Sequence, residues 1–175
     1  MRQNGFYQFF FLAKIQPPGT MSALVVMGVS GCGKSSAGEA IARQLGWALV
    51  EGDSYHSPQS VAKMQAGIAL TDADREGWLE RLAQRLAQAD AEHGLVLTCS
   101  ALKKVYRDRL RNACPGLRFV FLEIDRASAG QRVAARAGTH FFSSALVDSQ
   151  FATLESPVGE AGVLRLDALL DLPTL

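Results

Sequence analysis

The stretch of sequence that decides the fold is Gly28-Val29-Ser30-Gly31-Cys32-Gly33-Lys34-Ser35. It matches the pattern G-x-x-x-x-G-K-[ST], in which glycines let backbone N–H groups turn towards phosphate oxygens. An apolar run, Ala23–Met27, precedes the stretch, and a helix-like segment, Ser36–Leu45, comes after it. Because this is the strand–loop–helix context that the pattern requires, residues 28–36 are predicted to form a P-loop that binds a nucleoside triphosphate.

Side chains of this loop have separate expected roles. Lys34 is expected to reach the β- and γ-phosphates as a catalytic cation, and Ser35 to bind Mg²⁺. Ser36 opens the helix, whose N-terminal dipole adds positive potential. Cys32 lies beside the same helix terminus, a position that lowers the pKa of a thiol, so a reactive cysteine is one expectation.

Outward from the loop, strand-like and helix-like segments alternate. Apolar runs predict strands at 23–27, 47–50, 95–99, 118–124 and 163–166, and helical patterns fall at 36–45, 54–66, 74–91, 102–110, 128–136 and 145–154. Alternation of this kind predicts parallel βαβ units. We therefore expect an α/β fold with a central, mostly parallel five-stranded sheet flanked by helices.

Composition sets limits on the class of protein. The 175 residues suit one domain, and 48% hydrophobic residues can build a core. A net charge of +1 argues against bulk electrostatic binding of nucleic acid, and no apolar run is long enough for a membrane span. Three cysteines without a CxxC motif are typical of reduced thiols, which favours a cytoplasmic location.

Residues 1–20 differ from the rest, since they hold five of the fourteen aromatic residues and end near Pro17-Pro18-Gly19. The preferred interpretation is a flexible extension ahead of a domain at 21–175. The alternative is an arm that packs on a partner subunit.

The class of P-loop protein depends on the residues after the second strand. The guanine-reading motif Asn-Lys-x-Asp is absent, because the only asparagines are Asn4 and Asn112 and neither begins it. Strand two is succeeded by Glu51-Gly52-Asp53-Ser54-Tyr55-His56, and the carboxyl end of that strand opens into the crevice beside the P-loop. Asp53 could accept the proton of an attacking hydroxyl, which favours a small kinase. The alternatives are a helix N-cap for Asp53 and a surface role for His56.

The third strand, Leu95–Cys99, ends without the acidic residue that often helps to hold the nucleotide's metal ion. Mg²⁺ is therefore expected to depend on Ser35, the phosphates and water, with Asp53 as a further candidate.

Over residues 22–167 the sequence resembles the gluconokinase family of P-loop sugar-acid kinases. The elements of the resemblance are Met27–Ser35, Glu51-Gly52-Asp53, His56, Ala62–Gly67, Leu70–Arg75, Trp78-Leu79, Cys99–Asp108, His140-Phe141-Phe142 and Ser149–Pro157. The resemblance implies a P-loop kinase with a short lid that uses ATP and Mg²⁺ to phosphorylate the 6-hydroxyl of D-gluconate.

The resemblance also suggests which residues surround the substrates. Lys103 and Arg107, four residues apart on one helix, are expected to bind the sugar acid together with Asp53, His56 and His140. Arg132 and Arg136 are expected to close from the lid onto the transferring phosphoryl group. By spacing alone, both pairs could instead be solvated surface residues. Trp78, Leu82 and Leu86 are predicted to be core residues.

Two alternative functions stay open from the sequence. One is a kinase for another sugar acid or polyol, and the other is a non-catalytic nucleotide-binding regulator on the same fold. The expected partners are ATP and D-gluconate, without nucleic acid or membrane. The resemblance allows for a homodimer, although no segment of the sequence identifies a subunit surface.

Overall fold

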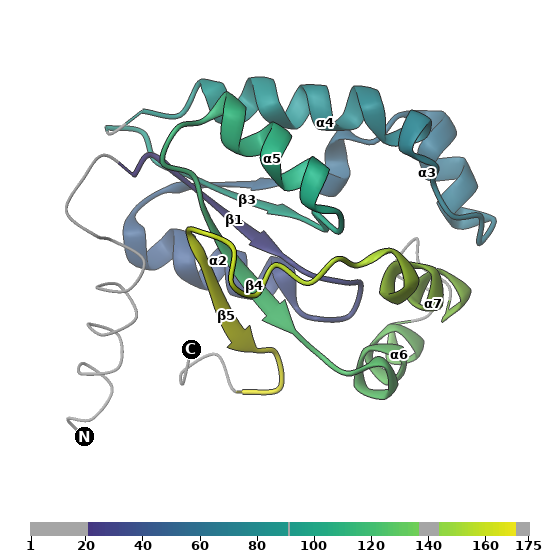
Figure 1. Cartoon of the computed structure of the whole chain (residues 1–175). Helices are drawn as coiled ribbons and strands as arrows, with labels where there is room; N and C mark the ends of the chain where they lie inside the picture. Colours follow the sequence, from purple (N-terminus) through teal and green to yellow (C-terminus); the bar gives the residue numbers. More distant parts are fainter. Residues whose placement is uncertain (1–20, 91, 137–143, 171–175) are drawn as a thin grey trace.

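The computed structural model describes residues 21–90, 92–136 and 144–170. Its strands are β1 (Ala23–Met27), β2 (Ala48–Glu51), β3 (Leu95–Cys99), β4 (Arg118–Glu123) and β5 (Val163–Asp167). They form one sheet in the order β2-β3-β1-β4-β5, with all four pairs of neighbours parallel (Figure 1). The predicted α/β fold is confirmed, and the sheet within the described residues is entirely parallel rather than mostly so.

The helices connect these strands and cover both faces of the sheet. They are α2 (Lys34–Leu45), the 3₁₀ helix η1 (Gly52–Tyr55), α3 (Pro58–Gln65), α4 (Asp72–Ala87), α5 (Lys104–Ala113), α6 (Arg126–Ala135) and α7 (Ser144–Thr153). Figure 1 shows α4 and α5 on one face of the sheet and α2 on the other, with α3, α6 and α7 towards the carboxyl ends of the strands. Because the strands are parallel, the loops that follow them all lie at the same end of the sheet, where the strands have their carboxyl ends.

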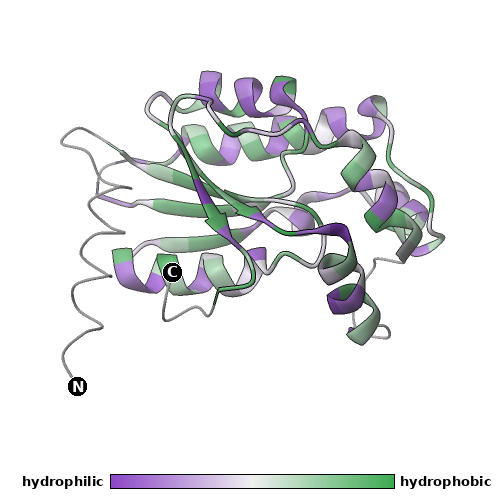
Figure 2. Ribbon diagram, turned by 60° about the horizontal axis from the view of Figure 1, so that its bottom comes forward, coloured by the Kyte–Doolittle hydropathy of each residue, from purple (hydrophilic) through white to green (hydrophobic). Residues whose placement is uncertain are grey.

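The central strand β1 shows why two layers of helices are needed. All five of its residues are buried, and they alternate between two hydrophobic clusters. Leu24 and Val26 pack with residues of α2, whereas Val25 packs with residues of α4 and α5. Hydropathic colouring shows the same apolar strands in the interior (Figure 2). An uninterrupted apolar run is what a parallel strand covered on both faces requires.

The segment 54–66, in which polar residues and a helix were expected, holds the end of η1 and the whole of α3. Ser57 caps the second helix, because its hydroxyl oxygen accepts a hydrogen bond from the Ser60 N–H at 3.1 Å. Pro58 occupies the first helical position, where a missing N–H costs nothing. The chain therefore makes a short 3₁₀ turn at 52–55 before the α-helix begins.

Helix α4 begins two residues earlier than predicted and ends at Ala87. Thr71 and Asp74 form a reciprocal capping box, which satisfies backbone donors at the start of the helix. The predicted core positions are confirmed, because Trp78, Leu82 and Leu86 are almost completely buried against the sheet.

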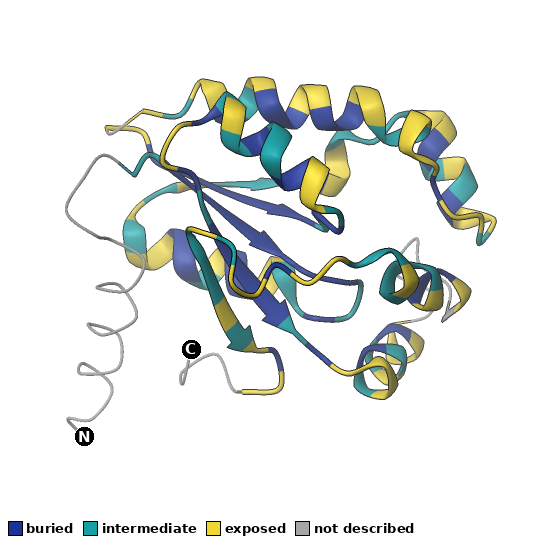
Figure 3. Cartoon of the chain, viewed as in Figure 1, coloured by how far each residue is buried: buried dark blue, intermediate teal, exposed yellow. Residues whose placement is uncertain are grey.

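Burial decreases towards the edges of the sheet (Figure 3). Strands β1 and β3 are fully buried, whereas β2 and β5 consist of intermediate and exposed residues. Among the residues that the structure describes, no helix is both long and apolar enough to cross a membrane. The predicted extension at 1–20 and residues 137–143, which include the predicted substrate contact His140, lie outside the described residues.

Candidate active site

A cleft of about 300 Å³ opens at the carboxyl ends of the strands, between the loop after β1 and the helices around it. This is where ligands bind in open parallel sheets. Its lining residues are Ser30, Gly31, Gly33, Lys34, Ser35, Ser36, Glu51, Asp53, His56, Met64, Ala69, Leu70, Arg75, Ser100, Val133, Arg136, Leu146, Ser149 and Gln150. The cleft brings most of the predicted P-loop together with two of the predicted acceptor residues.

The P-loop takes the backbone path that its glycines allow. Gly31 and Gly33 have φ angles of 84° and 91°, in the region that other residues adopt only with strain. The side chain of Lys34 donates to the carbonyl oxygens of Gly28 and Val29, at 3.0 Å each. The loop is thus tied to its own lysine, and a bound phosphate would replace the carbonyl oxygens as the partner of that ammonium.

Helix α7 contributes a contact to this loop that sequence reasoning missed. The Ser30 N–H donates to the side-chain oxygen of Gln150 at 2.6 Å. An N–H of a P-loop ordinarily serves phosphate, so Gln150 holds a donor that nucleotide binding would use. The only sequence signal for Gln150 was its place in the last stretch of the family resemblance.

Arg132, in the last turn of α6, and Arg136, immediately after this helix, have different positions. Arg136 lines the cleft. Arg132 is half-buried and donates to the carbonyl oxygens of Gly31, at 3.4 Å, and Ala168, at 3.1 Å. Arg132 therefore joins α6 to the P-loop from outside the cleft lining, whereas Arg136 is part of that lining.

The expectation of a reactive Cys32 is wrong for a physical reason. Its side chain points into the hydrophobic cluster around β1 and is 2% exposed. Burial raises the pKa of the thiol, and this effect is larger than the lowering caused by the Lys34 charge and the loop N–H groups. Cys32 is therefore a packing residue of the P-loop.

The carboxylate that accompanies Ser35 is Glu51, for which the sequence predicts no role. The Ser35 hydroxyl donates to Glu51 Oε2 at 3.1 Å, and the Thr98 hydroxyl donates to the same oxygen at 2.5 Å. A hydroxyl and a carboxylate are hard oxygen donors of the kind that Mg²⁺ binds while it keeps several waters. No group of three His, Cys, Asp or Glu side chains suited to a metal occurs among the described residues.

Asp53 lies on η1 and lines the cleft. It does not cap a helix, because Ser57 caps α3 and Glu51 is the residue before η1. Its side chain is 49% exposed, and Oδ1 lies 3.8 Å from Nε2 of His56. The capping alternative is thus excluded, and Asp53 is left with an accessible carboxylate.

Helix α4 holds the turn that carries Asp53. The Trp78 indole N–H donates to the Gly52 carbonyl at 2.8 Å, and the Arg81 guanidinium donates twice to the Tyr55 carbonyl, at 2.7 and 2.9 Å. Gly52 cannot be replaced without displacing β3, because a Cβ there would lie 2.2 Å from the Thr98 carbonyl oxygen. Both ends of η1 are therefore anchored by side chains of one helix.

His56 is a buried, neutral neighbour of Asp53. Its ring stacks on Trp78 with centroids 4.5 Å apart, and its side chain is only 6% exposed. Nδ1 is buried without a hydrogen-bond partner among the described residues. Burial lowers the pKa of His56, while Asp53 opposes this effect and Arg75 and Arg81 add to it. His56 therefore provides an uncharged ring beside the exposed carboxylate.

Arg75, which lies in the first turns of α4, is a cation that lines the cleft together with Asp53 and His56. Its guanidinium donates to the Leu70 carbonyl at 2.7 Å and lies 5.8 Å from the centroid of the Tyr106 ring. Sequence reasoning quoted Arg75 within the resemblance but gave it no role, because an isolated arginine near a helix start has no distinctive spacing.

Lys103 and Arg107 do not line the cleft. Lys103 precedes α5 and pairs with Asp72 at 2.8 Å, and Asp72 also accepts a hydrogen bond from Tyr106. Lys103 and Tyr106 hold the pKa of the Asp72 carboxyl below its usual value. The assignment of Lys103 as a substrate ligand therefore has no support from its position.

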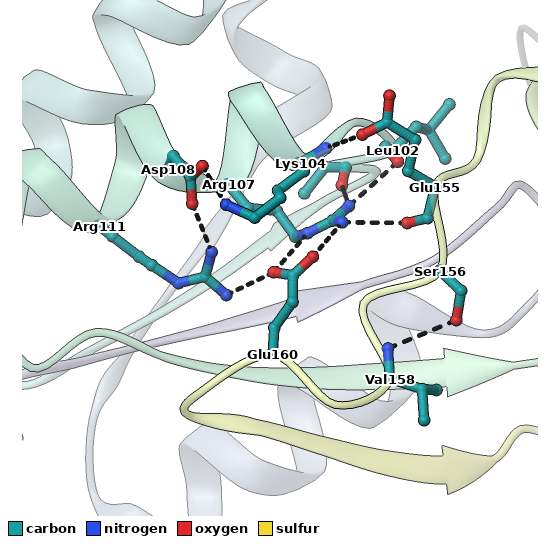
Figure 4. Close-up of polar contacts among 10 residues, drawn as sticks. Leu102, Lys104, Arg107, Asp108, Arg111, Glu155, Ser156, Val158 and Glu160 are labelled. Carbon is teal, nitrogen blue, oxygen red and sulfur yellow. Dashed lines mark hydrogen bonds and ion pairs between the residues drawn. The ribbon is translucent and has the colours of Figure 1, made fainter.

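The position of Arg107 gives no support to its assignment as a substrate ligand, and it excludes the alternative of a solvated surface residue. Its side chain is completely buried, and its polar contacts are with groups of the protein (Figure 4). The guanidinium donates to the carbonyl oxygens of Ala101, Leu102 and Glu155 and to the carboxylate of Glu160. Arg107 holds the pKa of Glu160 below its ordinary value, which keeps the pair ionised.

Comparison with known proteins extends the similarity over most of the chain. A family model described as an AAA domain matches residues 24–157. A gluconokinase of Gluconobacter oxydans is 45% identical over 82% of this chain and 80% of its own length. The thermoresistant gluconokinase of Escherichia coli is 41% identical over 82% of each. The crystal structure of a gluconokinase from Sinorhizobium meliloti superimposes with a TM-score of 0.79, at 46% identity, over 87% of this chain and 85% of that one.

Proposed function

Because the chain belongs to the gluconokinase family, we propose that it transfers the γ-phosphoryl group of ATP to the 6-hydroxyl of D-gluconate, giving 6-phospho-D-gluconate. The observation that carries this proposal is a single cleft lined by P-loop residues, by Asp53 and by Arg75. A phosphoryl donor, a proton acceptor and an anion-binding cation are what a sugar-acid kinase requires. A regulator that only binds nucleotide requires neither the proton acceptor nor the anion-binding cation.

We propose Asp53 as the residue that receives the proton of the attacking hydroxyl. The hydroxyl oxygen forms a bond to the γ-phosphorus, the bond from that phosphorus to the β–γ bridging oxygen breaks, and ADP leaves. The half-exposed carboxylate of Asp53 and its anchored turn support this role. Neutral His56 is proposed to orient the carboxylate and to contact the substrate.

Arg75 replaces Lys103 and Arg107 as the proposed partner of the gluconate carboxylate. A guanidinium presents two parallel N–H donors that match a carboxylate. Arg75 lines the cleft with Asp53 and His56, and it projects from a helix whose start is fixed by a capping box. His140 stays a predicted substrate contact.

At the other side of the cleft, Lys34 is proposed to balance the charge of the β- and γ-phosphates. Ser35 and Glu51 would hold Mg²⁺, Glu51 through water or directly, and the ion would supply positive charge to the phosphate oxygens. Arg136 is proposed to contact the transferring phosphoryl group. Arg132 is proposed to support the P-loop instead, because its guanidinium donates to the Gly31 carbonyl.

We also propose the domain boundary, the location and the assembly of the chain. The kinase domain is proposed to begin at Met21, with residues 1–20 dispensable for phosphoryl transfer. A cytoplasmic location is supported by three cysteines that are free and buried. Assembly as a homodimer is proposed only on the family relationship.

The experiment that tests the function is an ADP-release assay on the purified full-length chain with ATP and Mg²⁺. D-gluconate is compared with other sugar acids and with neutral polyols, and Lys34→Ala provides the background rate. We expect turnover with D-gluconate to exceed that with any polyol by at least tenfold. Equal turnover with a polyol would favour the broader kinase, and ATP binding without any turnover would favour the regulator.

A further inference from the structure

The turn after β3 has an unusual backbone that Arg107 supports. Ala101 has a φ of 45°, and it is the only residue other than glycine with a positive φ among those described. An alanine in this conformation is strained, and such strain persists only where surrounding contacts impose it. Ala101 is completely buried, and its carbonyl oxygen accepts a hydrogen bond from Arg107 at 2.8 Å.

The strained turn decides the position of a residue in the cleft. Ser100, immediately before Ala101, is half-buried and lines the cleft with Lys34, Glu51 and Asp53. A different backbone conformation at Ala101 would change where Ser100 points. No charged side chain other than Arg107 donates to the carbonyl oxygens of 101 and 102 in the described part of the chain.

Arg107 also joins this turn to the segment after α7. Its Nη2 donates to the Glu155 carbonyl at 3.0 Å and to Glu160 Oε1 at 2.5 Å, as Figure 4 shows. Two further bonds join the same segments, since the Glu155 N–H donates to the Leu102 carbonyl at 2.9 Å and the Glu155 carboxylate accepts from the Lys104 N–H at 2.6 Å. Helix α7 in turn carries Gln150, which contacts the P-loop.

We propose that Arg107 is a positioning residue, which acts through the turn at Ala101 to hold Ser100 in the cleft. The same side chain couples this turn to the segment after α7. The planar guanidinium is needed because its donors diverge towards carbonyls of two segments and a carboxylate. A lysine would keep the charge beside Glu160 but could not bridge the same set. The inference rests on the proposed function for its kinetic test.

The kinetic test is a double-mutant cycle between Arg107→Lys and Ser100→Ala, with gluconate as acceptor. Arg107→Lys should lower kcat/KM at least tenfold in the natural chain but less than threefold when Ser100 is already alanine. The second loss is smaller because both substitutions remove the same contribution, that of a correctly placed Ser100 side chain. The matched control is Arg111→Lys. Arg111 lies on the same helix and pairs with Glu160 but does not contact the turn, so this variant should stay within twofold in either background. An equal loss from Arg107→Lys in both backgrounds would overturn the proposal.

A second measurement does not depend on the substrate. Amide hydrogen exchange of the full chain should quicken at least tenfold over residues 100–103 and 154–156 in Arg107→Lys and remain unchanged there in Arg111→Lys. If the natural chain fails to phosphorylate gluconate, the proposed function fails and the exchange result alone decides the role of Arg107. Unchanged exchange at 100–103 in Arg107→Lys contradicts the proposal whatever the activity.

Discussion

The phosphate side and the acceptor side of the cleft are built in different ways. On the phosphate side, one contiguous stretch, residues 28–36, supplies the loop, the lysine and the helix terminus. On the acceptor side, the cleft takes Asp53 from η1, Arg75 from α4 and Ser100 from the end of β3. The basic residue that lines the cleft there is Arg75, to which the sequence assigned no role, whereas the predicted Arg107 is buried outside the cleft lining. A site made from one stretch of backbone can be identified from a motif, whereas a site made from distant side chains is identified from the sequence only in part, as Asp53 and Arg75 show.

The largest effect is expected on the phosphate side. Lys34→Ala should lower kcat by about 10²–10³-fold, because an electrostatic contact to the transition state is worth about 3–4 kcal/mol. The variant should fold normally, since the two carbonyl oxygens that Lys34 contacts belong to its own loop and join no other element. Steady-state kinetics with a thermal melt as control checks this. A well-folded variant with near-normal kcat would remove the basis for the phosphate site.

On the acceptor side, Asp53→Asn should lower kcat by roughly 10²–10⁴-fold, the usual contribution of a positioned acid or base. The affinity for ATP should change little, because Asp53 serves the hydroxyl and not the phosphates. Isothermal titration with a non-hydrolysable ATP analogue separates the two effects. Ser54→Ala on the same turn is the matched control. If Asp53→Asn weakened ATP binding as much as it slowed turnover, Asp53 would belong to the phosphate side.

The two basic candidates on the acceptor side can be compared directly. Arg75→Ala should raise the KM for gluconate by about 10–100-fold, because a hydrogen bond between charged groups is worth about 1.5–3 kcal/mol. Lys103→Ala should raise it by less than threefold, because Lys103 pairs with Asp72 outside the cleft. Gluconate titrations of both variants are the measurement. The reverse order of effects would restore Lys103 as the ligand that its sequence position suggested.

The kinetic effects of changing Arg132 and Arg136 should differ as well. Arg136→Ala is expected to lower kcat about tenfold with little change in gluconate KM, because electrostatic stabilisation of the phosphoryl group acts in the transition state. Arg132→Ala should mainly raise the KM for ATP, since Arg132 supports the Gly31 carbonyl. Kinetics at varied ATP and varied gluconate distinguish these patterns. Identical profiles for the two variants would favour the paired clamp.

The smallest effect concerns pH and His56. Its pKa is lowered in the folded chain, so as pH falls below the ordinary value of about 6.5 the unfolded chain binds the proton first. The contribution of His56 to the free energy of unfolding is therefore fully present above about pH 6.5 and is lost as pH falls towards the pKa of the folded state. Urea unfolding at about pH 7.5 and about pH 5.5 should show a decrease that His56→Phe removes and that His93→Gln, a change at an exposed histidine, does not. An unchanged decrease in His56→Phe would assign the pH dependence to other groups.

The sequence by itself determined the layered fold and the phosphate loop. The apolar runs at 23–27 and 95–99 require cover on both faces, and this requirement together with the helices between them leaves a parallel sheet. The loop could be read because its glycines, lysine and serine act through local backbone geometry. Asp53 could be proposed because strand two ends beside that loop.

Only the tertiary structure decided which polar side chains face the cleft. Arg107 and Lys103 share a spacing that suits an anion site, yet Glu160, Glu155 and Asp72 occupy their donors from segments far along the chain. Cys32 has the sequence position of a reactive thiol, yet its burial against β1 raises the pKa. The chemistry of these basic residues and of Cys32 depends on desolvation and on the partners that long-range packing brings to them. The spacing of nearby residues encodes neither desolvation nor these partners.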